Sequence, residues 1–155
     1  MTIIKAGAIA PDFTLEDNQG ATFSLKDFRG KKVLLSWHPL AWTSVCTDQM
    51  RALDANWERF NKLNTVPVGL SVDPVPGKTA WGAVLSIRKV KLPSDFWPHG
   101  ETASKYGIFN KELGLSERAN ILIDEEGKVI WAKQYPMGEL PDINEVFDVI
   151  QAASQ

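Results

Sequence analysis

Cys46 is the residue best placed to do chemistry, and it is the only cysteine among the 155 residues. It follows a strongly apolar segment and a proline-containing loop, at the point where an amphipathic helix is predicted to begin. Free backbone N–H groups and the positive end of the helix dipole favour a thiolate there. Cysteines in such positions have thiol pKa values lowered from about 8.5 to roughly 3.5–7.5. Cys46 is therefore a candidate nucleophile.

Two residues just upstream add to this candidate site. Thr43 precedes Cys46 by three residues, which places its hydroxyl one helical turn away on the same face. That hydroxyl can donate to a bound oxygen atom or accept from a donor. Taken alone, Thr43 suits a helix N-cap and Pro39 suits a strand terminator. Together with Cys46, they form a candidate site centred on one sulfur atom.

The cysteine count also excludes several kinds of site. One cysteine cannot form a disulfide within the chain or a cysteine-rich zinc site, and the two histidines offer little else for a transition metal. We therefore expect no zinc or other transition-metal site. Any sulfur chemistry that this chain performs must use one atom.

Net charge and hydropathy limit the kinds of partner and the cellular compartment that we expect. Seventeen basic and nineteen acidic residues give a net charge of -2, so no basic excess suggests nucleic acid or an anionic membrane as a partner. No apolar run approaches the ~20 residues of a membrane span, and the first residues do not resemble a signal peptide. A reducing cytoplasm, where a lone thiol stays free, is the expected location.

The first elements predicted from the patterning are strands. Apolar residues flank a turn-forming cluster at 17–20, which predicts an N-terminal β-hairpin closed by a short turn of helix near 28–30. Residues 32–37 have the continuous apolar character of a central strand covered on both faces. Residues 65–72 predict a second apolar strand.

One amphipathic helix is predicted to carry the cysteine. Its buried stripe repeats at steps of three and four residues through Cys46, Met50, Leu53, Trp57 and Phe60. The opposite face carries charges, Asp54 and Arg59 among them, that we assign to solvent.

The second half of the chain alternates helices, loops and a hairpin. The predicted elements are a loop at 73–77, a helix at 78–89, a loop at 91–100, a short helix at 101–106, hairpin strands at 119–124 and 128–133, and a final helix opening near Pro141. The expected fold is α/β: one thioredoxin-like domain over residues 1–155, with a central mixed β-sheet flanked by helices and an N-terminal β-hairpin extension.

The segment from Pro39 to Cys46 reads Pro-x-x-x-Thr-x-x-Cys and resembles the active-site signature of the peroxiredoxins, thiol peroxidases on a thioredoxin-like fold. The resemblance extends over about residues 3–150. Residues 7–15 are similar to the family's opening G-x-x-A-P-D-F-x-L. Residues 92–100 resemble a loop of the alkyl hydroperoxide reductase E branch, and residues 118–124 resemble the family strand R-x-x-F-x-I-D.

This resemblance implies a role for each matching residue. Cys46 would attack a peroxide oxygen and become a sulfenic acid. Thr43 would orient the peroxide, and Pro39 would shape the pocket and shield the sulfur. Arg118 would hold the thiolate and polarise the O–O bond, a task that suits a permanently charged group with several donors. The implied substrates are hydrogen peroxide and small organic hydroperoxides, and the implied enzyme needs no metal, haem or flavin cofactor of its own.

The chain departs from many relatives in two respects. His38 stands before the motif proline, where relatives often have an aromatic residue. No second cysteine is present: Arg51 and Gly77 occupy places where some branches carry one. The resemblance thus implies a one-cysteine enzyme whose sulfenic acid is reduced by an external thiol, such as thioredoxin, glutaredoxin or a low-molecular-weight thiol. It also implies a homodimer, to which Trp42, Trp81 and Trp97 are candidate contributors.

Three other functions would also use a cysteine or a nearby histidine. A thioredoxin-fold redox sensor or binding protein would use the same pocket but pass its oxidation to a partner. A dithiol oxidoreductase would need a C-x-x-C pair. This chain lacks the first cysteine of such a pair, because Thr43 occupies that position. A Cys–His hydrolase would need His38 or His99 as its base; we expect His99 instead to bond to backbone or solvent.

Overall fold

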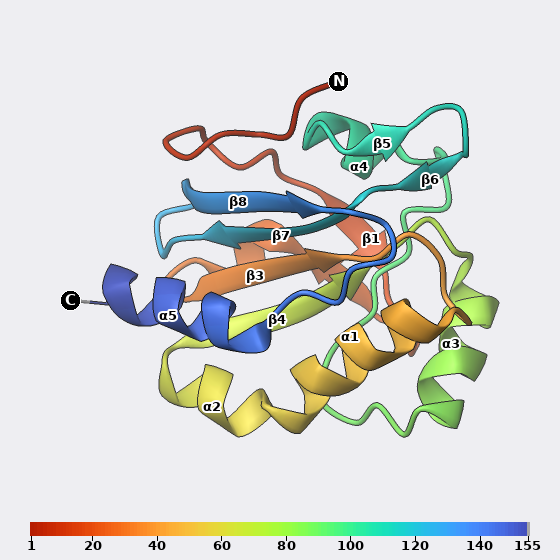
Figure 1. Cartoon of the computed structure of the whole chain (residues 1–155), viewed down its shortest axis with the longest axis horizontal. Coiled ribbons are helices and arrows are strands. Elements are labelled where there is room, and N and C mark those ends of the chain that lie inside the picture. The colour runs from red at the N-terminus through yellow and green to blue at the C-terminus, as the bar shows by residue number, and fades with distance from the viewer. Residues whose placement is uncertain (155) are drawn as a thin grey trace.

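The computed structural model describes residues 1–154 and confirms a mixed α/β architecture (Figure 1); Gln155 lies outside the described residues. The strands are β1 (Thr14–Glu16), β2 (Thr22–Ser24), β3 (Lys32–Trp37), β4 (Thr65–Leu70), β5 (Phe109–Asn110), β6 (Leu115–Ser116), β7 (Arg118–Ile123) and β8 (Val129–Tyr135). The helices are the 3₁₀ turn η1 (Leu25–Phe28), α1 (Ser44–Ala55), α2 (Trp57–Lys62), α3 (Val75–Val84), α4 (Glu101–Lys105) and α5 (Ile143–Ala153).

The central sheet has the strand order β4-β3-β7-β8. β3 and β4 are parallel, with Trp37 paired to Leu70, so their carboxyl ends meet at one edge of the sheet. β7 runs antiparallel to β3, with Ala119 paired to Trp37. Because β7 begins with Arg118, its first residue lies at that same edge, beside the loop that leads from β3 into α1.

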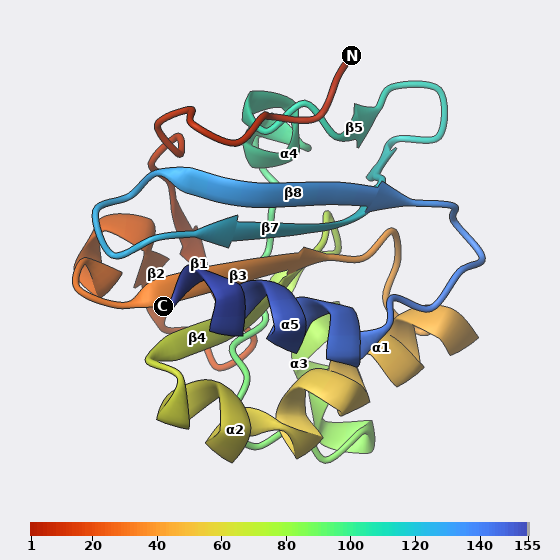
Figure 2. The ribbon, with the colours of Figure 1, turned by 60° about the vertical axis from the view of Figure 1, so that its left-hand side comes forward.

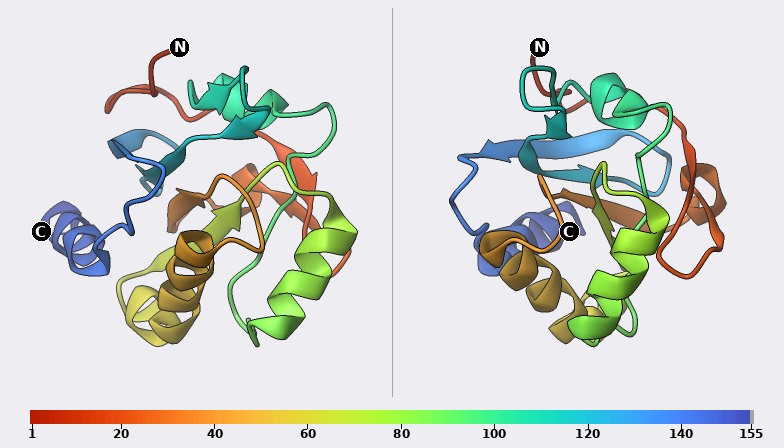
Figure 3. Two further views of the ribbon diagram at one scale, coloured as in Figure 1. Left: turned by 45° about the vertical axis from the view of Figure 1, so that its right-hand side comes forward. Right: turned by 90° about the vertical axis from the view of Figure 1, so that its right-hand side faces the viewer.

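Two apolar layers cover the two faces of this sheet. Leu34 and Leu122 pack in a cluster with buried residues of α1, α2, α3 and α5, while alternate residues such as Leu35 and Ile121 pack with α4 and the N-terminal hairpin. Figures 2 and 3 show this division, with α4 and the N-terminal segment on one side of the sheet and α1, α2, α3 and α5 on the other. Alternation along strands buried on both faces explains the near-continuous apolar sequences.

The N-terminal hairpin forms as predicted. β1 and β2 pair with Leu15 opposite Phe23, and η1 follows directly. The turn is held by Asp17, whose Oδ1 accepts hydrogen bonds from the backbone N–H groups of Gln19 and Ala21. Such local carboxylate bonds explain why Asp favours turns.

The prediction of one continuous helix from Cys46 to Phe60 is wrong. The chain breaks at Asn56 into α1 and α2. The Asn56 side-chain amide donates to the Ala52 carbonyl at 2.8 Å, a local bond by which asparagine competes with regular helix geometry. The buried stripe nevertheless continues across the break and reaches Phe60, whose ring packs at a tilt against Phe147 of α5.

The helix predicted at 78–89 is displaced. α3 begins three residues earlier, at Val75, because a proline is tolerated in the first turn of a helix, and Gly77 consequently lies inside α3. It ends near Leu85 because Ser86 adopts a left-handed φ of 57° and the Ile87 N–H bonds back to the Gly82 carbonyl, a common C-terminal helix motif. The two-residue strands β5 and β6, which pair antiparallel, were not predicted.

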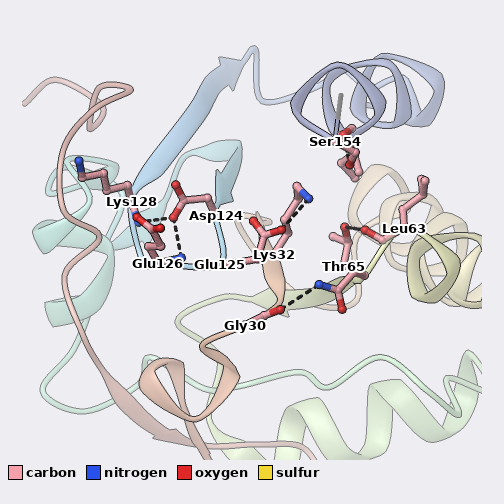
Figure 4. Close-up of polar contacts among 11 residues, drawn as sticks. Gly30, Lys32, Leu63, Thr65, Asp124, Glu125, Glu126, Lys128 and Ser154 are labelled. Carbon is pink, nitrogen blue, oxygen red and sulfur yellow. Dashed lines mark hydrogen bonds and ion pairs between the residues drawn. The ribbon is translucent and has the colours of Figure 1, made fainter.

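Figure 4 shows the edge of the sheet where β3 begins, which is the edge opposite Trp37. Buried Lys32 pairs with Glu125 at 3.1 Å. Oδ1 of Asp124 accepts from the Glu126 and Lys128 N–H groups and shapes the turn between β7 and β8. These contacts fix this end of the strands, whereas the loops of the candidate site follow the opposite end, where β3 and β4 finish.

Asp54 also differs from its assignment to a solvated helix face. Its carboxylate accepts backbone hydrogen bonds from three successive residues, Arg88, Lys89 and Val90, with the shortest at 2.8 Å. It thereby ties the segment after α3 to α1. Arg59, assigned to the same face, lies 3.8 Å from the Phe147 ring centroid instead of projecting freely.

We expect Asp54→Ala to lower the free energy of unfolding by about 1–3 kcal/mol, because hydrogen bonds to a charged acceptor are lost. Urea denaturation followed by fluorescence measures the effect. Asp48→Ala is the matched control, since Asp48 is an exposed residue on the same helix. Equal loss of stability in both variants would contradict the proposed anchoring role of Asp54.

Candidate active site

Cys46 lies in the first turn of α1 and its side chain is buried. Thr43 is the N-cap residue, and the first intrahelical bond runs from the Thr47 N–H to the Thr43 carbonyl. The Cys46 N–H therefore belongs to the group of amides that has no partner one turn back. No acidic side chain occupies the first turn, so the positive end of the helix dipole is not offset by a nearby carboxylate.

Arg118 places its guanidinium against the sulfur. Nη2 donates to Cys46 Sγ at 3.4 Å, while Nε and Nη2 donate to the Met137 carbonyl at 3.1 and 2.8 Å. The residue is only 2% exposed. Within residues 1–154, no carboxylate oxygen lies within 4.0 Å of its nitrogens. Its charge is therefore directed toward the thiol rather than neutralised by an ion pair.

Gln49 is a site residue that the sequence analysis missed. Its Oε1 accepts from Arg118 Nη1 at 2.6 Å, and its Nε2 donates to Ser36 Oγ at 2.7 Å and to the Trp37 carbonyl at 3.2 Å. It thus braces the guanidinium against β3. A signal was present in the sequence, because Gln49 is a polar residue three positions after Cys46 on the inner stripe.

The four residues singled out from the sequence all line one shallow pocket of about 270 Å³. The rest of the lining is mostly apolar and consists of Leu40, Ser44, Val45, Leu115 and Met137. The Thr43 hydroxyl donates to the Leu40 carbonyl at 2.7 Å. Because its proton is used in this bond, the oxygen of Thr43 is left as a hydrogen-bond acceptor.

The loop at 38–43, which we call the Pro39 loop, is fixed at its centre. The Ala41 N–H donates to Asp73 Oδ2 at 2.9 Å, and Ala41 is buried. The next residue, Trp42, has a left-handed φ of 71°, an unfavourable conformation for a side chain of this size. The bonds made by Ala41 and Thr43 on either side hold this conformation.

His38 does not form a Cys–His pair. It is fully buried, neither ring nitrogen has a hydrogen-bond partner within the described chain, and its ring packs on Trp81 at 5.2 Å between centroids. Burial, aided by the charges of Lys78 and Arg118, lowers the pKa of His38 well below 6.5 and keeps the ring neutral. No hydrogen bond joins it to Cys46 in residues 1–154, so the geometry gives no support to a hydrolase.

His99 and the tryptophans are also placed by the structure. His99 contacts the Phe96 and Gly114 carbonyls at 3.2 and 2.7 Å, as predicted for a residue that bonds to backbone. Trp81 is buried and cannot serve a surface interface as the sequence analysis suggested, whereas Trp97 is 79% exposed and Trp42 is 56% exposed.

This arrangement suits attack by a sulfur nucleophile on a small oxygen-containing electrophile. The helix N-terminus and Arg118 supply positive charge and preorganised donors at the sulfur, where negative charge sits and then moves to a leaving oxygen. Over residues 1–154, no cluster of three or more His, Cys, Asp or Glu side chains is placed to hold a metal ion. No helix in the same range is long and apolar enough to cross a membrane.

Comparisons with known proteins agree with this geometry. The AhpC/TSA family profile matches residues 6–132. Alkyl hydroperoxide reductase E of Mycobacterium tuberculosis is 36% identical over 141 residues, which cover 90% of this chain and 92% of that protein. A peroxiredoxin of Thermoplasma volcanium is 34% identical over 157 residues, covering 96% of this chain and 74% of that protein.

A solved structure carries the same fold. The reduced 2-Cys peroxiredoxin of Plasmodium vivax superposes with a TM-score of 0.88 at 28% identity, over 96% of this chain and 81% of that one. Its likeness confirms the expected thioredoxin-like arrangement of sheet and helices. Sequence, fold and the thiol site thus lead to one conclusion: this chain belongs to the AhpC/TSA family and is a peroxiredoxin, a thiol-dependent peroxidase.

Proposed function

We propose that Cys46 is the peroxidatic cysteine, and that Arg118, Thr43 and Pro39 complete its site. The Cys46 thiolate attacks the terminal oxygen of a hydroperoxide ROOH. The S–O bond forms as the O–O bond breaks, so sulfur is oxidised to a sulfenic acid and the peroxide is reduced. The leaving RO⁻ takes up a proton and departs as an alcohol, or as water when the substrate is hydrogen peroxide.

The surrounding groups act on the charge that moves in this step. Arg118 and the free N–H groups at the start of α1 stabilise the thiolate first and the leaving oxygen afterwards. The Thr43 oxygen, whose own proton is bound to Leu40, accepts the O–H of the peroxide and orients it. Pro39 is buried beneath the pocket and excludes water from the sulfur.

The substrates we propose are hydrogen peroxide and small organic hydroperoxides. The polar groups of the pocket can bind the O–O unit that both substrates share. The apolar rim, to which Leu40, Leu115 and Met137 contribute, offers an alkyl group a surface that buries it from water.

We propose that an external thiol completes the cycle, since Cys46 is the only cysteine. A first thiol attacks the sulfenic acid, releasing water and leaving a mixed disulfide on Cys46. A second thiol displaces the enzyme thiolate and leaves as a disulfide. Thioredoxin, glutaredoxin or a low-molecular-weight thiol would serve, and the contact of Arg118 with the lone sulfur carries the assignment.

Mass spectrometry after one equivalent of peroxide tests this cycle. We expect a mass increase of one oxygen on Cys46, followed by a mixed disulfide when a candidate thiol is added, with many peroxides reduced per enzyme when that thiol is in excess. Hydrogen peroxide and tert-butyl hydroperoxide should both turn over. A single oxidation that no thiol reverses, with stable capture of a protein partner, would support the redox-sensor alternative instead.

We further propose a homodimer in a reducing compartment such as the cytoplasm. Exposed apolar side chains on loops support the dimer, chiefly Trp42, Phe96 and Trp97. Sedimentation of the native chain beside Trp97→Ser measures the assembly.

A further inference from the structure

Lys78 is a buried charged residue that the peroxidase chemistry described above does not use. Its side chain extends from α3 and is completely buried. Nζ donates to Ser71 Oγ at 2.9 Å, to the Pro93 carbonyl at 3.0 Å and to the Gly69 carbonyl at 3.3 Å. Within residues 1–154, no carboxylate oxygen lies within 4.0 Å of this nitrogen. An ammonium matches this pattern, because its three N–H groups face three acceptors.

From Lys78, hydrogen bonds continue to the active site. Ser71 Oγ receives the Lys78 bond and donates to Asp73 Oδ2 at 2.6 Å. The same Asp73 oxygen accepts the Ala41 N–H at 2.9 Å. Ala41 lies in the Pro39 loop, between two residues that line the Cys46 pocket. The ammonium is thus connected to the active-site backbone through two side chains.

We propose that Lys78 is a positioning residue that fixes the Pro39 loop through Ser71 and Asp73. Its ammonium orients the Ser71 hydroxyl so that the hydroxyl proton points to Asp73, and the oriented carboxylate then holds Ala41. The left-handed φ of Trp42 directly follows this anchor, so loss of the anchor releases the loop. The inference rests on the proposed peroxidase function and adds a residue that acts on the site without touching the peroxide.

The charged state of Lys78 is opposed by its surroundings. Burial lowers its pKa from 10.5 to about 7, although the negative charges of Asp73, Asp95 and Cys46 act in the opposite direction. His38 from the end of β3 also faces it and is neutral because of its own lowered pKa. The anchor is therefore expected to weaken as pH rises through about 7, when the amine loses its third N–H group.

Lys78→Met tests the proposal because it keeps a long apolar stem without the charge. We expect the rate constant for Cys46 oxidation by peroxide to fall about tenfold at acidic pH, the scale of a slightly misplaced site. The ratio of native to variant rates should decline toward one as pH rises through the pKa of Lys78. Lys62→Met, at an exposed lysine of α2, is the matched control and should follow the native profile.

Ser71→Ala tests whether Lys78 acts by positioning the Pro39 loop or only through its charge. This variant keeps the Lys78 ammonium but breaks its connection to Asp73. Hydrogen exchange at the Ala41 amide gives a readout that does not depend on peroxidase activity. We expect its protection to fall about tenfold or more in both Lys78→Met and Ser71→Ala. The Ala10 amide, bonded to the Gly127 carbonyl at 2.9 Å, serves as the internal reference.

As pH rises, the free energy of unfolding should increase, although the anchor of the Pro39 loop weakens. Because the pKa of Lys78 is lower in the folded chain than in the unfolded chain, the unfolded state binds more protons between about pH 7 and pH 10.5. The midpoint of thermal unfolding therefore rises with pH through this window in the native chain, and this rise is smaller in Lys78→Met.

Unchanged Ala41 protection in both variants, or parallel rate–pH profiles for the native chain and Lys78→Met, would overturn the proposal. If Lys78→Met does not fold, hydrogen exchange at the Ala41 amide of Ser71→Ala tests the proposal by itself. Absence of peroxide reduction by the native chain would refute the proposed function, while the Ala41 measurement would still test the anchor.

Discussion

Replacing Cys46 with serine is expected to lower peroxide reduction by roughly 10⁴-fold or more, to the background rate of the added thiol. The serine hydroxyl is not ionised near neutral pH and cannot expel the leaving oxygen from a peroxide. The structure offers no substitute, because no other sulfur nucleophile exists in the chain except the thioethers of methionine. Peroxide consumption with dithiothreitol as reductant measures the effect.

The cysteine substitution should leave the fold intact. Serine is close to cysteine in size, and its hydroxyl can accept from Arg118 where the sulfur does now. Thermal unfolding of Cys46→Ser provides the control for folding. Equal rates of peroxide consumption by the native chain and a folded Cys46→Ser variant would disprove the assignment of the nucleophile.

Arg118→Ala is expected to lower the rate of Cys46 oxidation by about 10²–10³-fold, the effect of removing a preorganised donor from a developing negative charge. The guanidinium donates to Sγ at 3.4 Å, so its loss removes positive charge from the place where the reacting sulfur lies. Stopped-flow peroxide kinetics measures the effect.

Two further variants sharpen the arginine test. Arg118→Lys keeps the charge but cannot contact the sulfur, Gln49 and the Met137 carbonyl at once, so we expect an intermediate rate. Arg51→Ala changes an exposed arginine on α1 and should behave as the native chain. An oxidation rate that is identical in Arg118→Ala and the native chain would count against the proposed role.

The fold was predictable where the apolar pattern is long and regular. The central strands, the N-terminal hairpin and the final helix follow directly from that pattern. The pattern did not locate the break at Asn56 or the early start of α3. In both places a side chain or a proline decides the local backbone, and an apolar stripe is insensitive to that choice. The two-residue strands β5 and β6 are too short to leave a periodic signal.

The sequence by itself determined the candidate chemistry: one sulfur, placed at a helix start after Pro39 and Thr43, in a chain without a second cysteine. Residue types and short spacings are sufficient for that, because all of these residues belong to one continuous segment. Tertiary structure decided everything that joins distant segments. Arg118 lies 72 residues from Cys46 and reaches it only because β7 pairs antiparallel to β3. Lys78, Asp73 and Ala41 are joined for the same kind of reason: parallel pairing of β3 and β4 brings both carboxyl ends to one edge of the sheet, where their loops meet.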